Sequence, residues 1–538
     1  MTPFDPLSQM YVSQRFPVYA CGGMVNASSP QAAAAGLELL RQGGNAVDAA
    51  VAAASTLTVT EPTSNGIGSD AFAIIWSEKE QKLLGLNASG PAPMLADPDR
   101  IRGDGRDGNG KMPVYGWTPV TVPGAPKAWA ELTSRLGRMP LEKNLLPAIR
   151  YAREGYPCAP NLAWAWKTAH QRYRTLWSDS MFGAWFQTFA PGGKTPETGE
   201  LVRLPWHGDA LEEIASTHAE SFYTGRLARK MDERSRKDGG YLRYEDLAAF
   251  RPRWVEPVRV RYRDYEVCEI PPNGQGIVAL IALSILQFFP MSQRSPLTCH
   301  RQIEALKMAF ADAFLHVTDP EHMEVDIPTL LSPDRCEKRA MEMNETARCW
   351  SSTLPRKSGT VYLCCADAEG NLVSYIQSNY MGFGSGIVVD GIALQNRGAD
   401  FSLNPGDINC LRPGKRTYHT IIPGFLMKDG KPVGPFGVMG GYMQPQGHVQ
   451  LMNNFIDFHM NPQQALDAPR FQWMRDGSVT VESRFEPAWA GELERRGHRI
   501  RTDLNTPSFG RGQMIVRLDN GVLVGGCESR TDSLIACM

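Results

Sequence analysis

The sequence predicts an α+β globular protein, and three observations lead to that prediction. Residues 24–60 are rich in alanine and carry helix-capping signals. Residues 125–320 place apolar side chains at spacings of three and four. From Thr360 onward the chain is β-branched and aromatic, broken by glycine-rich turns. With 538 residues, 42 % of them hydrophobic, it is long enough to bury a large core without disulfides or metals.

Charge and hydropathy exclude several classes of protein. Lys and Arg number 56 against 57 Asp and Glu, for a formal net charge of −1. No basic face is implied, so we expect no nucleic-acid partner. No apolar run is long enough to cross a membrane, and the first residues lack the charged-then-apolar layout of a signal peptide. We therefore expect a soluble protein located in the cytoplasm, with no membrane partner.

The stretch from 24 to 60 predicts two helices that pack as a hairpin. Ser29 and Pro30 supply an N-cap and a first-turn proline for the first helix, and Gly43 ends it. Asn45 can cap the second helix, AVDAAVAAASTLTV, whose small side chains allow close packing. The runs AIIW and KLLGLNAS that follow indicate strands.

The cysteines do not form a recognisable framework. There are 11, scattered along the chain without a CxxC pair, which predicts buried thiols rather than disulfides or a zinc site. Cys364 and Cys365 lie in a strand-like run, so we expect one on each side of a sheet. The histidines are equally dispersed, and neither a metal nor a cofactor is predicted.

Two glycine clusters invite a functional interpretation. Gly382, Gly384 and Gly386 precede a β-branched run instead of a helix, which argues against a phosphate-binding loop and leaves a bulge or a ligand-facing loop. Gly440 and Gly441 lie between an apolar strand-like run and a predicted helix. There, backbone N–H groups can form an oxyanion hole, although a plain turn has the same sequence.

Thr360 begins a strand directly after a polar segment that ends in Ser358 and Gly359. If the Gly359–Thr360 bond were cut, Thr360 would carry a free α-amine beside its own hydroxyl and so combine nucleophile and base. Taken alone, an ordinary strand threonine is by far the better interpretation, because threonine is common in strands.

Several stretches, in chain order, resemble the signatures of the γ-glutamyltransferase (glutathione hydrolase proenzyme) family. They are MVNASSPQAAAAGLELLRQGGNAVDAAVAA, VTEPTSNGIGSDAF, YGWTPVTVPGAP, PPNGQGIVAL, TVYLCCADAEGNLVSYIQSNYMGFGSGIVV, KRTYHTIIPGF and GVMGG. The resemblance covers nearly the whole chain and is strongest to the bacterial YwrD-like branch.

The resemblance implies an N-terminal nucleophile hydrolase with a four-layered αββα sandwich, made as one precursor. Autocleavage between Gly359 and Thr360 would give a large subunit, 1–359, and a small subunit, 360–538, that stay together as a heterodimer. Thr360 would attack a γ-glutamyl amide, with its own α-amine as general base. The resemblance further implies that Ser378 supports the nucleophile, that Gly440 and Gly441 form the oxyanion hole, and that Asp400 grips the substrate's amino group.

The sequence departs from the family pattern in the substrate clamp. The departures are Val361 and Tyr362 after the nucleophile, Tyr380 for an asparagine, Arg397 for a glutamine, His419 and Thr420 for a serine pair, and Ala96 near the usual carboxylate-binding arginine. Since a guanidinium matches a carboxylate, we hypothesise that Arg397 binds a substrate carboxylate. Asp400 then binds an amine or holds Arg397; alternatively the two form a salt bridge without a ligand.

Three functions are consistent with these residues. The first is hydrolysis, with or without transfer, of the γ-glutamyl group of glutathione or a related amide. The second keeps the threonine chemistry and changes the acyl group to another small dicarboxylic monoamide, such as oxamate or a glutaryl amide. The third is an uncleaved, inactive homologue that serves as a binding scaffold, suggested by Val361 and Tyr362 beside the bond to be cut.

Overall fold

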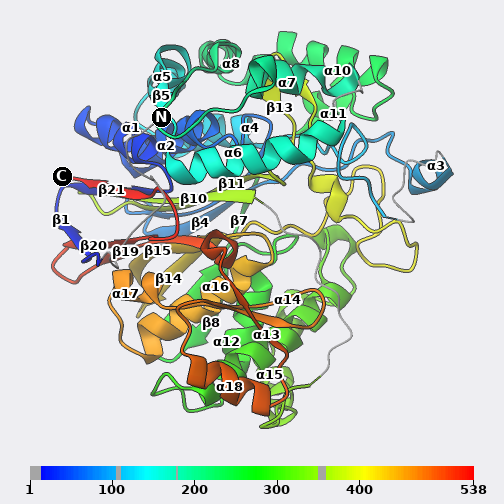
Figure 1. The fold of residues 1–538 in the computed structure, drawn as a ribbon. Coiled ribbons are helices and arrows are strands. Elements are labelled where there is room, and N and C mark those ends of the chain that lie inside the picture. The colour runs from blue at the N-terminus through cyan, green and yellow to red at the C-terminus, as the bar shows by residue number, and fades with distance from the viewer. Residues whose placement is uncertain (1–13, 104–110, 177–179, 349–358) are drawn as a thin grey trace.

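A computed structural model describes residues 14–103, 111–176, 180–348 and 359–538. Two seven-stranded sheets lie face to face, and helices cover the outer face of each (Figure 1). All strand pairs within these two sheets are antiparallel. The expected four-layered αββα sandwich is confirmed. No helix in the described ranges is long and apolar enough to cross a bilayer.

Each sheet draws strands from distant parts of the chain. The upper sheet in Figure 1 runs β21 (Leu534–Cys537), β2 (Gly23–Ala27), β10 (Gly359–Asp367), β11 (Leu372–Tyr380), β3 (Asp70–Ser77), β4 (Lys82–Ala88), β7 (Arg253–Val255). The lower sheet runs β1 (Val18–Ala20), β20 (Leu523–Cys527), β19 (Arg511–Arg517), β15 (Lys431–Met439), β14 (Gly424–Lys428), β9 (Tyr265–Glu269), β8 (Val258–Tyr262). Smaller strand pairings join β5 (Tyr156–Pro157) to β6 (Leu201–Val202), β12 (Val388–Val389) to β13 (Ile392–Ala393), and β17 (Val479–Glu482) to β16 (Phe471–Trp473) and β18 (Ile500–Asp503).

The helices divide between the two outer layers. Above the upper sheet lie α1 (Pro30–Arg41), α2 (Ala46–Thr60), α4 (Ala125–Leu136), α5 (Leu141–Glu154), α6 (Pro160–Tyr173), α7 (Gly183–Phe189), α8 (Pro205–Ser216), α9 (Glu220–Tyr223), α10 (Arg226–Lys237) and α11 (Tyr244–Ala249), with α3 (Pro98–Gly103) at one side. Below the lower sheet lie α12 (Gly276–Leu286), α13 (Pro296–His316), α14 (Ile327–Leu330), α15 (Pro333–Met341), α16 (Met443–Met452), α17 (Pro462–Asp467) and α18 (Pro487–Arg495).

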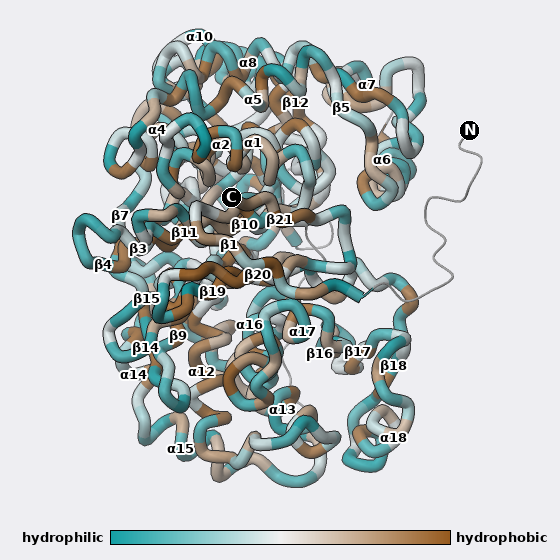
Figure 2. The backbone as a smooth tube through the Cα atoms, turned by 90° about the vertical axis from the view of Figure 1, so that its left-hand side faces the viewer, coloured by the Kyte–Doolittle hydropathy of each residue, from teal (hydrophilic) through white to brown (hydrophobic). Residues whose placement is uncertain are grey.

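The core consists of three main apolar layers. One lies between the upper helices and their sheet, one between the two sheets, and one between the lower sheet and its helices. In Figure 2 the tube is brownest along the central strands β19 and β20, and teal is frequent in the outer loops and helices. Cys365 belongs to the helix-facing layer and Cys364 to the layer between the sheets, so the two cysteines do face opposite sides of β10.

The helical hairpin forms as predicted. Pro30 occupies the first turn of α1, although the Ser29 side chain makes no capping hydrogen bond there. The Asn45 side chain accepts hydrogen bonds from the N–H groups of Val47 and Asp48 and so caps α2. Every residue of α2 is buried, because this helix lies between α1, α5 and the upper sheet.

Close packing of this hairpin depends on Gly36 in α1. A Cβ atom there would lie 2.8 Å from Val25 Cγ1 and 2.9 Å from the Ala49 carbonyl oxygen. The exposed helix α18 offers a matched control in Gly491, whose Cβ would meet nothing closer than an Arg495 Nη atom at 3.9 Å.

Gly36→Ala is therefore expected to lower the free energy of unfolding by about 1–3 kcal/mol through overpacking. Gly491→Ala is expected to raise it by about 0.5–1 kcal/mol, because alanine is the better helix former. Thermal unfolding followed by circular dichroism measures both. Equal shifts for the two variants would contradict the packing argument.

Candidate active site

Thr360 lies near the start of β10, a buried central strand of the upper sheet. β10 pairs with β11 through Gly359 opposite Tyr380 and Val361 opposite Gln377, and the register shifts between these pairs. One residue of β10, Thr360, thus lies opposite two residues of β11, Ser378 and Asn379, which makes a β-bulge with the extra residue on β11. The ten residues before Gly359, 349–358, lie outside the described ranges.

The Thr360 hydroxyl belongs to a chain of hydrogen bonds. It donates to Ser378 Oγ over 3.3 Å, and Ser378 Oγ donates to the Gly359 carbonyl oxygen over 2.6 Å. The backbone N–H of Tyr380 donates to the same Ser378 oxygen over 2.8 Å. Ser378 therefore contacts the Thr360 hydroxyl and the Gly359 carbonyl, which belong to the two residues on either side of the bond that is predicted to be cut.

The departures at Val361 and Tyr362 do not change the surroundings of the Thr360 hydroxyl. Val361 points into the layer beneath the upper helices, and Tyr362 into the layer between the sheets. The Tyr362 ring packs over Gly437, where a Cβ would lie 2.4 Å from the ring, and its hydroxyl contacts Ser374 Oγ at 2.8 Å. Both residues therefore serve core packing.

Gly440 and Gly441 lie at the turn that joins β15 to α16, as predicted. Both have left-handed backbone angles, φ of 138° and 62°, which suit glycine. Gln444, at the start of α16, links this turn to the nucleophile. Its side-chain amide donates to Thr360 Oγ1 over 3.4 Å and accepts from the Ile422 N–H over 2.9 Å.

The Arg397 side chain is fully buried and only partly paired. Its Nη1 donates to Thr420 Oγ1 over 2.7 Å, and its guanidinium lies 4.6 Å from the centre of the Tyr380 ring. Asp70 and Asp400 approach no closer than 3.6 Å and 3.8 Å, so the ion pairs lack direct hydrogen bonds. The Nε and Nη2 atoms of Arg397 have no hydrogen-bond partner among the described residues.

Asp400 faces Arg397 across this cluster. Its Oδ1 accepts hydrogen bonds from the hydroxyls of Tyr380, over 2.6 Å, and Tyr442, over 3.2 Å. Its Oδ2, on the side of Arg397, has no hydrogen-bond partner among the described residues. Burial raises the pKa of Asp400 to about 6, against the opposing effect of Arg397 and the two hydroxyls.

His419 reaches the cluster through Asp70. Its Nε2 lies 2.9 Å from Asp70 Oδ2, and its ring packs against Phe72 at 4.7 Å between centroids. Burial, and then the nearby Arg397 guanidinium, lowers the pKa of His419 to about 4, so the imidazole is neutral at neutral pH. Neutral His419 therefore adds no positive charge beside Arg397.

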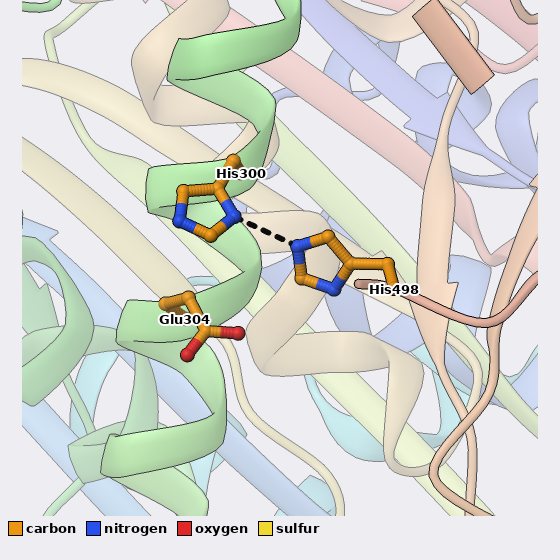
Figure 3. Close-up of side chains that lie close together, drawn as sticks. All are labelled: His300, Glu304 and His498. Atoms are coloured by element: carbon orange, nitrogen blue, oxygen red, sulfur yellow. Dashed lines mark hydrogen bonds between the residues drawn. The ribbon is translucent and has the colours of Figure 1, made fainter. Parts of the chain in front are cut away.

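A second buried polar cluster joins α13 to the chain after α18. Figure 3 shows His300 and Glu304 on one face of α13, with His498 pointing toward them. His300 Nδ1 and His498 Nε2 lie 2.8 Å apart, and His300 Nε2 donates to the Asn344 carbonyl over 2.8 Å. Lys307 Nζ lies 2.8 Å from Glu304 Oε1 and donates to His498 Nδ1 over 3.4 Å.

This arrangement resembles a metal-ligand set, but its ring nitrogens are already used. Lys307 donates to His498, His498 to His300, and His300 to the backbone, so no imidazole lone pair faces an open position. The Lys307 ammonium supplies the positive charge that Glu304 requires. Glu304 Oε2 also accepts from the Arg348 N–H over 3.2 Å, so the cluster holds the backbone at Arg348 against α13.

The structure brings the sequence-predicted residues together in two adjoining groups. Thr360 and Ser378 form the first group, with Gly440 and Gly441 linked to it through Gln444, and Tyr380, Arg397, Asp400, His419 and Thr420 form the second. Tyr380 joins them, since its N–H contacts Ser378 and its hydroxyl contacts Asp400.

Sequence analysis missed Asp70, Tyr442, Gln444 and Gln275. The Gln275 amide donates to the carbonyls of Thr420 and Gly441, which ties the two groups together. The only available signal for Tyr442 and Gln444 was their position beside Gly441.

The fold and this threonine-centred site define an N-terminal nucleophile hydrolase. Residues 32–538 match the family described as Gamma-glutamyltranspeptidase, and the chain belongs to that family of enzymes. The family acts on small-molecule substrates.

Similar proteins carry different names for their activity. The chain is 33 % identical to the Glutathione hydrolase-like YwrD proenzyme of Bacillus subtilis, over 93 % of this chain and 95 % of the relative. It is 32 % identical to the Oxamate amidohydrolase proenzyme of Klebsiella pneumoniae, over 96 % and 98 %. Among solved structures, the cephalosporin acylase from Bacillus halodurans is 54 % identical, with a TM-score of 0.96 over 100 % of this chain and 99 % of that one.

Proposed function

We propose that this protein is a self-processing threonine amidohydrolase that releases a small dicarboxylic acyl group from its amide. The observation that carries the proposal is the buried Arg397 guanidinium, whose nitrogen atoms Nε and Nη2 have no hydrogen-bond partners among the described residues. A substrate carboxylate would satisfy both atoms at once, as the fork of an arginine allows.

The hydrogen-bond chain at Thr360 supports the proposal of self-processing. Thr360 Oγ1 attacks the Gly359 carbonyl carbon while Ser378, which donates to the carbonyl oxygen, polarises it. The C–N bond breaks, the nitrogen takes a proton, and an ester links Gly359 to the Thr360 oxygen. Water then hydrolyses the ester, which leaves a Gly359 carboxylate and a Thr360 with a free α-amine.

The mature threonine then repeats this chemistry on the substrate. Its α-amine takes the hydroxyl proton as Oγ1 attacks the substrate amide, and the leaving amine receives that proton. The N–H groups at Gly440 and Gly441 stabilise the oxyanion, and Gln444 orients Oγ1 through its amide. Water, or an acceptor amine, finally releases the acyl group from the oxygen.

The charges of Arg397 and Asp400 favour one of the two candidate acyl groups. In the γ-glutamyl case Asp400 must bind an ammonium group, but its Oδ1 already accepts from two tyrosine hydroxyls and its Oδ2 faces Arg397. Placing a second cation beside a buried guanidinium is unfavourable. A glutaryl-type monoamide lacks the ammonium and therefore fits this cluster better. The cephalosporin acylase name of a 54 % identical structure supports the same choice.

A γ-glutamyl amide is the second candidate, because Asp400 keeps one oxygen without a hydrogen-bond partner among the described residues. The names of the glutathione hydrolase relatives support it. Under either candidate we propose a heterodimer of 1–359 and 360–538 that acts without a cofactor, in the cytoplasm.

Purified wild-type protein is expected to give one fragment that ends at Gly359 and one that begins at Thr360, measured by denaturing mass spectrometry. Thr360→Ala removes the nucleophile and is expected to stay as one chain. Thr360→Ser keeps a hydroxyl and is the matched control, expected to be cut at the same bond. A single uncut chain in all three proteins would instead support an inactive scaffold.

Arg397→Gln is expected to raise the KM of processed enzyme for glutaryl-p-nitroanilide about ten- to hundredfold, since a charge-assisted hydrogen bond contributes about 1.5–3 kcal/mol. Butyryl-p-nitroanilide, which lacks the carboxylate, serves as the control and should keep its KM. Steady-state kinetics on glutaryl-p-nitroanilide, γ-glutamyl-p-nitroanilide and oxamate make the comparison. An unchanged KM for every carboxylate-bearing substrate would refute the role of Arg397.

The pH profile separates the two acyl groups. A carboxyl with a raised pKa is protonated below about pH 6 and ionised above it, so Asp400 gains its charge as pH rises through that value. The kcat/KM for γ-glutamyl-p-nitroanilide, divided by that for the glutaryl substrate, should therefore rise between about pH 5 and pH 7. In Asp400→Asn the ratio should be flat. A flat ratio in the wild type would show that Asp400 does not bind the amine.

A further inference from the structure

A cavity of about 800 Å³ opens beside the loop that follows β4 and the segment that follows α11. Its walls are partly apolar, with Ala92, Met94 and Leu95 on one side and Phe250 on the other. Its lining contains none of the residues of the Thr360 and Arg397 groups. This size and mixture of surfaces are typical of sites for small organic molecules.

Arg416 supplies the polar anchor of this cavity. The residue is 7 % exposed, and burial lowers the pKa of its guanidinium. Nε donates to the Ser89 carbonyl over 3.0 Å, and the backbone N–H donates to Asp319 Oδ2. The Nε bond is the side-chain hydrogen bond that Arg416 makes to the described residues, so its Nη atoms are left for other partners, and the side chain lines the cavity. Arg416 therefore presents a rigidly held pair of donors to the cavity.

The charged side chains that line the cavity carry a net positive charge. The lining arginines are Arg236, Arg243, Arg251, Arg253 and Arg416, against the carboxyl groups of Glu245 and Asp246. Both Asp246 oxygens already accept backbone N–H groups, from Met94 and from Arg243.

The remaining lining arginines are engaged elsewhere. Arg253 pairs with Glu321 at 2.7 Å and Arg236 with Asp232 at 2.9 Å, while Arg243 and Arg251 donate to backbone carbonyls. Arg416 differs from these four arginines in being buried, whereas Arg236, Arg251 and Arg253 are exposed and Arg243 is half-buried.

We propose that this cavity binds a small organic carboxylate with an apolar body, the carboxylate on the Arg416 fork and the body against Met94, Leu95 and Phe250. A guanidinium fixed by one hydrogen bond at Nε, on a side chain that lines the cavity, matches a carboxylate in a two-point contact. The apolar walls contribute affinity by removing the body of the ligand from water.

The site adjoins the substrate cluster through one loop. Ser89 accepts from Arg416, and the N–H of the next residue, Gly90, donates to Asp70 Oδ1 over 3.1 Å. Asp70 in turn contacts His419 and approaches Arg397. The backbone at Ser89 and Gly90 therefore links the two sites, which use different arginines, so their ligands are separable by mutation.

Isothermal titration calorimetry of the full-length protein with 4-phenylbutyrate tests the proposal. The wild type is expected to bind at micromolar to millimolar concentration, and 4-phenylbutan-1-ol, which lacks the charge, about ten- to hundredfold more weakly. Arg416→Gln is expected to weaken 4-phenylbutyrate binding to the same extent. Ala249→Trp, an exposed change on the cavity wall, fills the space without touching Arg416 and should abolish binding.

Two controls assign the binding to this cavity. Arg259→Gln removes an exposed arginine on β8, in the other sheet, and should leave affinity unchanged. Arg397→Gln should also leave it unchanged, because that arginine serves the substrate cluster. Absence of binding by the wild type, equal binding of the alcohol, full affinity in Ala249→Trp, or loss of affinity in Arg397→Gln would each overturn the proposal.

Discussion

The position of β10 between β2 and β11 is the constraint on which the rest of the site depends. Pairing on both sides holds the strand that begins with Gly359 in the middle of a buried sheet. A register shift between β10 and β11 places Ser378 beside Thr360, and the two side chains are hydrogen-bonded. Because the neighbouring strand supplies Ser378, and the turn after β15 supplies the glycines, the arrangement around Thr360 depends on sheet register more than on loop conformation.

Several residues that depart from the family pattern lie together in a buried polar cluster around Arg397. Arg397, Asp70 and Asp400 have fully buried side chains, yet their closest approaches are longer than hydrogen bonds. In a medium of low polarity such unpaired donors and acceptors are costly unless a ligand completes them. His419 is neutral and adds no positive charge to the guanidinium of Arg397, which Thr420 and Tyr380 surround; under the proposed function this charge attracts the carboxylate of the acyl group.

Sequence reasoning located much of the fold because local signals and tertiary structure agree. The capped hairpin of α1 and α2, the strand that begins at Gly359 and the opposite faces of Cys364 and Cys365 all follow from short-range patterns. The αββα layering followed only from the family resemblance. Asp70 and Gln275 escaped notice, because their roles arise from contacts across hundreds of residues that no local pattern encodes. Val361 and Tyr362 suggested an inactive homologue, because they depart from the family pattern beside Thr360. In the structure, the alternation of side chains along β10 directs both into the core.

The interleaving of the sheets has a consequence for the assembled protein. The upper sheet sets β10, β11 and β21 among β2, β3, β4 and β7, and the lower sheet sets β14, β15, β19 and β20 between β1 and the pair β8 and β9. Both seven-stranded sheets thus mix strands from both sides of residue 359. Cleavage of the bond before Thr360 would not let the two fragments separate easily, because their separation requires the hydrogen bonds between strands of both seven-stranded sheets to break. We therefore expect the two fragments of a processed molecule to stay together and not to exchange with those of another molecule.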